Sequence, residues 1–100
     1  MDRWAGYADI NDARLYYETA GAGMPLVFIH GLGADGRVWD GQVDFFARRG
    51  QFIRYDLRGF GRSTLPGEGQ PYSHITDLLA LLDSRRVELD RRVCVHSVPA

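Results

Sequence analysis

The feature that most constrains this chain is a short run of consecutive β-forming residues, Leu-Val-Phe-Ile at positions 26–29. A strand that is apolar at every position, and not only at alternate ones, is buried on both faces, which is typical of a parallel sheet covered by helices on two sides. The run is followed at once by His-Gly-Leu-Gly at positions 30–33, where glycine allows the backbone to turn sharply. The sequence therefore predicts a buried strand that ends in a tight loop.

Strand and helix patterns alternate along the rest of the chain. Strands are predicted over residues 7–10 and 14–19, and the Asn11-Asp12 pair between them suits a hairpin turn because both residue types tolerate a positive φ. The elements predicted after the apolar run are, in order, a helix over 37–49, a strand over 52–55, a helix that begins at Ser73 and a strand over 93–95. Strands that alternate with helices imply right-handed crossovers and a parallel sheet.

Each predicted helix has one apolar face. In the first helix the apolar positions are Val38, Trp39, Val43, Phe46 and Ala47. In the second helix they are Ile75, Leu78, Leu79 and Leu82. Apolar residues at helical spacing mark the faces that we expect to pack against the sheet.

Composition limits the classes of protein to which the chain can belong. With 100 residues, 45% of them hydrophobic and 25% charged, it is expected to form one soluble globular domain, and no apolar run approaches the ~20 residues of a membrane span. The net charge of −1 gives no electrostatic basis for binding nucleic acid or an anionic membrane. We therefore expect a cytoplasmic protein with no nucleic-acid partner and no membrane partner.

The sequence predicts no cofactor and no metal. Cys94 is the only cysteine, which excludes an internal disulfide and a cysteine-rich metal centre. The three histidines, His30, His74 and His96, do not have the spacing of metal ligands. The phosphate-loop and dinucleotide-binding patterns are also absent.

Three polar segments follow the three strands of the predicted parallel sheet, at residues 30–33, 56–63 and 96–98. Ligands of open α/β sheets bind beyond the carboxyl ends of the strands, so these segments mark the expected site.

The middle segment is expected to have a structural role. Asp56 and Arg58 are predicted to fix this loop by charge-assisted hydrogen bonds, while Gly59 and Gly61 supply unusual backbone angles. A pair of glycines without a phosphate-loop pattern does not indicate phosphate binding.

In this order, the segments resemble the α/β-hydrolase superfamily of serine-nucleophile enzymes. Residues 25–33 look like its third strand and oxyanion loop, residues 56–63 like the glycine-rich loop after its fourth strand, and residues 72–83 like the helix that follows. The resemblance runs from about Ala8 to the last residue. It implies an α/β fold in which a hairpin precedes a parallel β-α-β-α-β unit, with residues 1–100 forming the N-terminal part of an incomplete domain truncated at the nucleophile elbow.

The resemblance also implies a site for acyl transfer. Ser97 is in the position of the nucleophile in the family's Gly-x-Ser-x-Gly elbow. The backbone N–H groups of Leu32 and Val98 would form the oxyanion hole during attack on a small-molecule acyl substrate, such as a carboxylic ester or lactone. The substrate-binding loop would contain His30, Gly31 and Gly33.

Two features depart from the family pattern. Val95 and Pro99 stand where the elbow has glycine, and extra bulk at such a close contact costs about 1–3 kcal/mol. Pro99 also restricts Val98 away from helical backbone angles. The Asp or Glu and the His of the triad follow the serine in the family, but neither follows Ser97 here. We therefore expect a hydrolase by ancestry that is inactive or incomplete as this chain.

Three other interpretations stay open: a non-catalytic truncated fragment, a small interaction module, and a relative of the cofactor-free haloperoxidases. Haloalkane dehalogenases and epoxide hydrolases share the early motifs, but they use aspartate as the nucleophile, so Ser97 argues against them.

The strand predicted over 93–95 corresponds to a central strand in the family, but in this chain it would lie at an edge of the sheet. An exposed apolar edge is a template for pairing with another chain. The sequence thus predicts self-association through this edge and a marginally stable or poorly soluble monomer.

Overall fold

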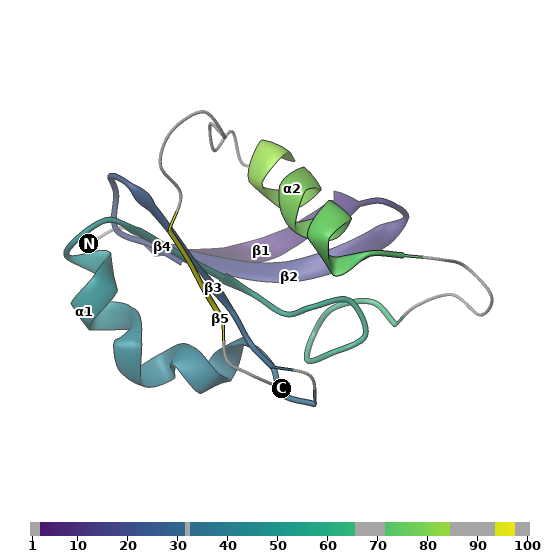
Figure 1. Cartoon of the computed structure of the whole chain (residues 1–100), viewed down its shortest axis with the longest axis horizontal. Coiled ribbons are helices and arrows are strands. Elements are labelled where there is room, and N and C mark those ends of the chain that lie inside the picture. The colour runs from purple at the N-terminus through teal and green to yellow at the C-terminus, as the bar shows by residue number, and fades with distance from the viewer. Residues whose placement is uncertain (1–2, 32, 66–71, 85–93, 98–100) are drawn as a thin grey trace.

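The computed structural model describes residues 3–31, 33–65, 72–84 and 94–97. In chain order its elements are β1 (Arg3–Ile10), β2 (Ala13–Ala20), β3 (Pro25–Ile29), the 3₁₀-helix η1 (Gly36–Gln42), α1 (Val43–Ala47), β4 (Gln51–Tyr55), α2 (His74–Ser84) and β5 (Cys94–Ser97), as Figure 1 shows. This is the predicted order of elements, and the two hairpin strands are longer than the pattern indicated.

The strands form one mixed sheet in the order β1-β2-β4-β3-β5. β3 lies between β4 and β5 and is parallel to both, in agreement with its uninterrupted apolar sequence. The hairpin is antiparallel and joins the sheet through β2, where Tyr17 pairs with Tyr55 of β4. The predicted α/β class and the parallel β-α-β-α-β unit are therefore confirmed.

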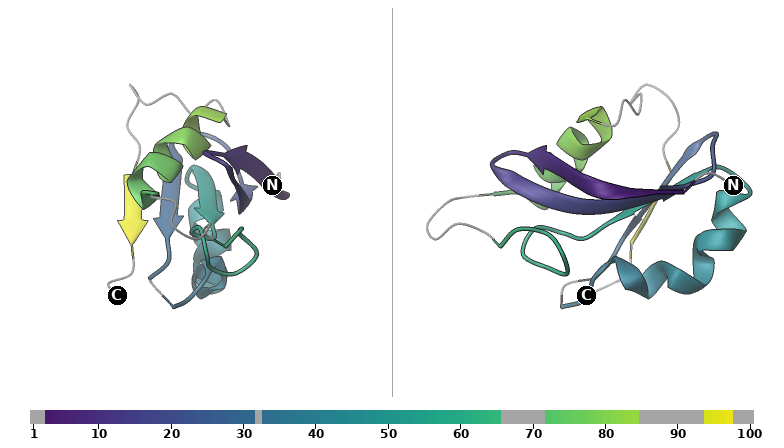
Figure 2. Two further views of the ribbon diagram at one scale, coloured as in Figure 1. Left: turned by 90° about the vertical axis from the view of Figure 1, so that its right-hand side faces the viewer. Right: turned by 180° about the vertical axis from the view of Figure 1, so that it is seen from behind.

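The helices cover opposite faces of the sheet, which explains why β3 is buried on both sides (Figures 1 and 2). The cluster under α2 includes Leu15, Val27, Ile53, Leu81 and Leu82. The cluster under α1 includes Phe28, Val43, Ala47 and Phe52. Side chains that alternate along β3 and β4 thus contribute to two separate cores, one on each face of the sheet.

The helix predicted over 37–49 is wrong in its type and bounds. A 3₁₀-helix occupies Gly36–Gln42, and the α-helix α1 begins only at Val43. Glycine has low helix propensity, and the backbone of Gly36 bonds to side chains outside the helix: its N–H to Asp56 and its carbonyl to Arg54.

The apolar face predicted for the second helix is wrong at two of its four positions. Ile75 and Leu79 are 72% and 47% exposed, whereas Asp77 is 1% exposed. The carboxylate of Asp77 accepts two hydrogen bonds from the guanidinium of Arg58, from Nε at 3.0 Å and from Nη2 at 2.9 Å. This buried ion pair requires the Asp77 side of α2 to face the sheet, so Ile75 turns toward solvent.

Removal of one partner of the buried Arg58–Asp77 pair should destabilise the fold by about 3–5 kcal/mol, because the remaining charge is left without compensation. We expect Asp77→Ala to lose this amount in urea unfolding followed by circular dichroism. The double variant Arg58→Met/Asp77→Leu, which removes both charges, should be more stable than Asp77→Ala alone.

The control for this experiment is Asp44→Ala, which removes an exposed ion pair with Arg3 and should cost less than about 1 kcal/mol. Equal losses for Asp77→Ala and Asp44→Ala would contradict the role assigned to the buried pair.

Candidate functional site

The carboxyl ends of the three parallel strands meet at one rim of the sheet. Ile29, the last residue of β3, is in register with Tyr55 at the end of β4 and with Ser97 at the end of β5. Figure 2 shows β3 and β5 side by side with their arrowheads pointing the same way. The loops after β3 and β4 therefore leave the sheet from one place, as the strand pattern predicted.

His30 connects the ends of β3 and β4. Its ring is 2% exposed, and its Nε2 accepts a hydrogen bond of 2.9 Å from the backbone N–H of Leu57. An acceptor at Nε2 assigns the ring proton to Nδ1, which lies 2.7 Å from the carbonyl oxygen of Gly31 and donates to it. Both ring nitrogens of a neutral imidazole are thus engaged with the backbone, so His30 has a structural role whether or not it also contacts a substrate.

The loop after His30 begins with a tight turn. The N–H of Ala34 bonds to the carbonyl oxygen of Gly31 at 3.2 Å, and Gly33 has a φ of +85°. A positive φ at this position favours glycine over residues with a Cβ atom. Leu32, the predicted oxyanion donor within the turn, lies outside the described residues, so its role stays a prediction.

The carboxylate of Asp56 joins this loop to the glycine-rich loop after β4. Its Oδ1 accepts a hydrogen bond of 2.7 Å from the N–H of Gly36, and its Oδ2 accepts one of 2.9 Å from the N–H of Arg62. Asp56 is 4% exposed, which strengthens both charge-assisted bonds by excluding water. The predicted structural role of Asp56 is therefore confirmed.

Gly61 makes this arrangement possible. Its φ is +54°, and a Cβ atom added there would clash with the carboxylate of Asp56. Gly59 also has a positive φ, of +88°, so the backbone angles predicted for the two glycines are confirmed.

The end of the glycine-rich loop is attached to β2. The hydroxyl of Ser63 donates a hydrogen bond of 2.5 Å to the carbonyl oxygen of Asp56 and accepts one of 2.9 Å from the N–H of Tyr16. The N–H of Thr64 bonds to the carbonyl oxygen of Arg14 at 2.9 Å. The loop is therefore held at both ends, by Asp56 within it and by the hairpin beside it.

The carboxylate of Asp35, beside the rim, has a lowered pKa. The guanidinium of Arg37 donates to its carboxylate, with Nη2 2.8 Å from Oδ2, and the N–H of Arg37 lies 2.9 Å from Oδ1. These hydrogen bonds lower the pKa of Asp35 from 3.8 to about 2. The same carboxylate caps the N-terminus of η1.

An open hollow lies between the two loops. It is lined by Gly33, Ala34, Asp35, Arg37, Val38, Gly59, Phe60 and Gly61. Of the predicted substrate-binding residues, the structure thus brings Gly33 to the wall of this hollow, whereas His30 is buried beneath it against the ring of Phe60.

The predicted nucleophile lies at the end of β5. The backbone of Ser97 pairs with Ile29, and that of Val95 pairs with Val27, so the chain reaches position 97 as an extended strand. The side chain of Ser97 is not among the described features, and Val98 and Pro99 lie outside the described residues. The roles of Ser97 as nucleophile and of Val98 as oxyanion donor stay predictions.

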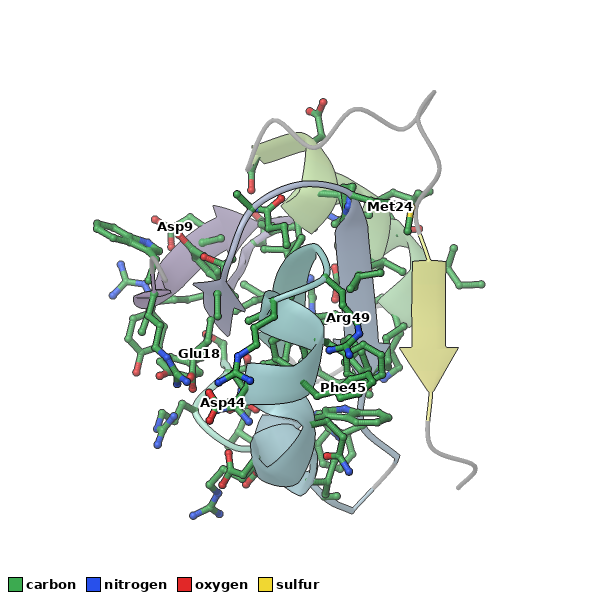
Figure 3. The ribbon with its side chains drawn as sticks, turned by 90° about the vertical axis from the view of Figure 1, so that its left-hand side faces the viewer. Asp9, Glu18, Met24, Asp44, Phe45 and Arg49 are labelled. Carbon is green, nitrogen blue, oxygen red and sulfur yellow. The ribbon has the colours of Figure 1, made fainter. Side chains whose placement is uncertain are left out.

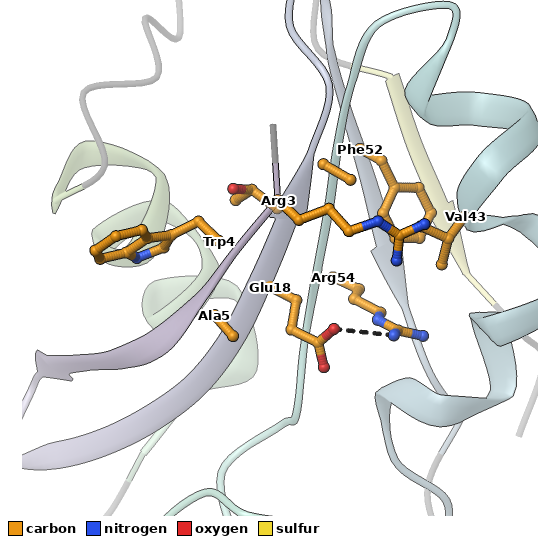
Figure 4. A pocket seen from close by; sticks show the side chains of 9 residues that line it. Arg3, Trp4, Ala5, Glu18, Val43, Phe52 and Arg54 are labelled. Carbon is orange, nitrogen blue, oxygen red and sulfur yellow. Dashed lines mark hydrogen bonds and ion pairs between the residues drawn. The ribbon is translucent and has the colours of Figure 1, made fainter. Parts of the chain in front are cut away.

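A second cavity, of about 270 Å³, lies away from the rim on the α1 face of the sheet (Figure 4). It is lined by Arg3, Trp4, Ala5, Glu18, Thr19, Ala20, Val43, Phe52 and Arg54. Arg54 is already paired with Glu18 at 3.0 Å and with Asp40 at 2.6 Å. None of the predicted site residues lines this cavity.

The described part of the chain contains no cluster of three or more histidine, cysteine, aspartate or glutamate residues placed to hold a metal ion. None of the helices described there has the length and apolar character needed to cross a membrane.

The Alpha/beta hydrolase family matches residues 26–97, from the second residue of β3 to the last residue of β5. The chain therefore belongs to the α/β-hydrolase family. It is 40% identical over 83 residues to a Synechocystis sp. protein provisionally named a non-heme chloroperoxidase, and the match covers 81% of this chain and 29% of that protein. It is 38% identical over 93 residues to a protein of Azorhizobium caulinodans provisionally named a carbamate hydrolase, with 92% and 35% of the two chains covered. The chain thus spans about a third of the length of these relatives.

Solved structures agree with this assignment. Est816, described as an N-acyl homoserine lactone degrading enzyme, is 32% identical with a TM-score of 0.79, and the match covers 90% of this chain and 34% of that one. The crystal structure of epoxide hydrolase VrEH1 from Vigna radiata has a TM-score of 0.84 over 97% of this chain and 32% of that one. Its identity of 24% shows a shared fold alone.

Sequence reasoning missed two residues that organise the rim, Gly36 and Asp77. Asp77 interrupts the apolar pattern of α2, and the partner of Arg58 was not specified by its predicted role within the loop. Pairing these two charges was the available signal. Gly36 offered no such signal, because a backbone N–H that binds a carboxylate 20 positions away leaves no pattern in the sequence.

Alanine substitutions at three glycines should separate backbone strain from steric clash. Gly61→Ala introduces both and should lower the free energy of unfolding by about 2–4 kcal/mol. Gly33→Ala has open space around the new Cβ but keeps a positive φ, so it should lose only about 1–2 kcal/mol. Gly41→Ala, with open space and no positive φ, should be neutral or gain up to about 1 kcal/mol. Urea unfolding would measure all three, and equal effects would contradict the close approach of Gly61 to Asp56.

The charge of Asp35 should stabilise the fold in a defined pH range. Its pKa in the folded chain is about 2, below the ordinary 3.8, so the carboxylate contributes stability above about pH 4, and this contribution is lost as the pH falls toward 2. Asp35→Asn keeps a side chain that can cap η1, so it isolates the charge. We expect this variant to be less stable than the native chain by up to about 1 kcal/mol at pH 6, and we expect most of this difference to be lost near pH 2. A difference of the same size at both pH values, measured by thermal unfolding, would argue against this role.

Proposed function

We propose that this chain provides the nucleophile strand and the oxyanion loop of a serine hydrolase that acts on a carboxylic ester, a lactone or a related acyl substrate. The observation that carries the proposal is that Ser97 of β5 is in register with Ile29, the last residue of β3. The loop that begins at His30 therefore starts beside Ser97. In this proposal the hydroxyl of Ser97 attacks the acyl carbon, and the N–H groups of Leu32 and Val98 stabilise the negative oxygen.

The relatives support this class of substrate. Est816 is described as degrading a lactone, and the relative from Azorhizobium caulinodans is provisionally named for the hydrolysis of a carbamate. Both reactions are attacks on an acyl carbon. The general base in our proposal is not His30, because its Nε2 is occupied by the N–H of Leu57 and its Nδ1 by Gly31. A base and an orienting carboxylate would have to come from residues beyond those of this chain.

A fluorophosphonate probe and a p-nitrophenyl ester test the proposed nucleophile. The protein, with any longer polypeptide of which this chain is part, should be labelled at Ser97 and should hydrolyse the ester. Ser97→Ala should abolish labelling at that site and lower kcat by at least about a thousandfold. The control Ser73→Ala, which changes a serine beside the N-terminus of α2, should keep both properties. Ester hydrolysis that is equal in Ser97→Ala and the native protein would overturn the proposal.

A second candidate is a cofactor-free haloperoxidase-like activity, which the name of the Synechocystis sp. relative favours. Peroxide-dependent bromination of monochlorodimedone would distinguish it from simple ester hydrolysis.

A third candidate is a non-catalytic chain, for which neither assay would respond to Ser97→Ala. A cytoplasmic location and a small molecule as the partner of the site complete the proposal. The net charge of −1 gives no electrostatic basis for a nucleic acid or an anionic membrane as that partner.

A further inference from the structure

The outer strand of the hairpin, β1, presents a long and regular edge at one side of the sheet. It lies last in the strand order and pairs with β2 without a bulge, from Arg3 opposite Ala20 to Ile10 opposite Ala13. Figure 3 shows β1, marked by Asp9, at the border of the molecule opposite to β5. Natural proteins protect such edges with proline, bulges or charged side chains, especially lysine. β1 has no proline, lysine or bulge, and its two charges, Arg3 and Asp9, lie near its ends.

The hairpin turn determines which backbone groups of β1 face outward. In a two-residue turn the flanking residues, here Ile10 and Ala13, form a hydrogen-bonded pair, and bonded and non-bonded pairs alternate from there. The even-numbered residues of β1 therefore bond to β2. The N–H and C=O groups that point away from β2 belong to Arg3, Ala5, Tyr7 and Asp9.

We propose that two copies of this chain pair through β1, antiparallel and about a two-fold axis at Gly6. A hydrogen-bonded ladder can form only where outward-facing residues of one copy lie opposite outward-facing residues of the other. Because these residues alternate along β1, each allowed register differs from the next one by a shift of two residues. The register centred on Gly6 places Arg3 opposite Asp9 of the second copy. It includes seven residues of each strand, from Arg3 to Asp9.

Charge complementarity selects this register. It creates two symmetry-related ion pairs between Arg3 and Asp9, and registers shifted by two residues lose both. Within one copy, Arg3 is paired with Asp44 and Asp9 is paired with Arg14. All four side chains are more than half exposed, so Arg3 and Asp9 remain accessible to a second copy. Opposite charges at facing positions of two strands stabilise their pairing.

The other side chains of β1 are compatible with the same register. Gly6 lies at the axis, in a non-bonded pair where the two Cα atoms approach to about 4.5 Å. Trp4, which leaves β1 on the side opposite to Arg3 (Figure 4), comes opposite the small Ala8 of the second copy. The described part of β5 has four residues, whereas β1 has eight, and we place the self-association at β1 and not at β5, where the sequence predicted it.

Charge reversal tests the register. By sedimentation equilibrium, the native chain should form a dimer, and Arg3→Glu and Asp9→Arg should each raise the dissociation constant at least about tenfold, because each places like charges opposite one another. An equimolar mixture of the two variants should restore the dimer, since the introduced glutamate then faces the introduced arginine. A chain that stays monomeric at millimolar concentration, or a dimer insensitive to both reversals, would overturn the proposal, and the second outcome would point to the β5 edge.

Cross-linking tests the axis independently. In the variant Gly6→Cys/Cys94→Ser, the two introduced thiols would face each other, and a Cβ at position 6 meets its neighbours no closer than 3.5 Å. Mild oxidation should therefore give a disulfide-linked dimer. In the control Ala5→Cys/Cys94→Ser the two cysteines would be about 8 Å apart, beyond the reach of a disulfide. Equal cross-linking of the two variants, with circular dichroism showing both to be folded, would reject the register.

Discussion

The rim of this sheet depends on the carboxylate of Asp56. One oxygen holds the N–H of Gly36 and the other holds the N–H of Arg62, so one side chain fixes two loops that are otherwise separate. Its position directly after β4 makes this possible, because β4 lies beside β3 and the two parallel strands end at the same rim. His30 adds a second connection by accepting the N–H of Leu57, and the ends of β3 and β4 are held together without any ligand. Loops supported in this way are preorganised, and the oxyanion stabilisation that we propose would require that property.

The pattern of the sequence was sufficient for the fold and for the common rim at which the three parallel strands end. The uninterrupted apolar run of β3 indicates burial on both faces, and the order of strands and helices then leads to a parallel unit whose polar segments share a rim. The positive φ angles of Asn11, Asp12, Gly59 and Gly61 also follow from residue type. These features are local, so the sequence alone contains the information.

The features that the sequence did not reveal depend on contacts between distant residues. The α2 helix has two possible apolar faces, and the ion pair with Arg58, 19 positions earlier, decides between them by requiring that Asp77 be buried. In the same way, the Gly36 backbone bonds to Asp56 and Arg54, and the first helical segment begins as a 3₁₀-helix. Helix periodicity describes only what a segment can bury, whereas long-range polar partners determine which side it does bury.

The strand order also has a consequence for how the protein folds as it is synthesised. Because β4 lies between β2 and β3, the hairpin and β3 have no native contact with each other through the sheet until residues 51–55 have left the ribosome. The hairpin, whose contacts are local, can form early, and β3 must wait as an apolar segment without a neighbour. The arrival of β4 then joins both at once, so a translational pause before this strand would prolong the exposure of the apolar β3 segment in the nascent chain.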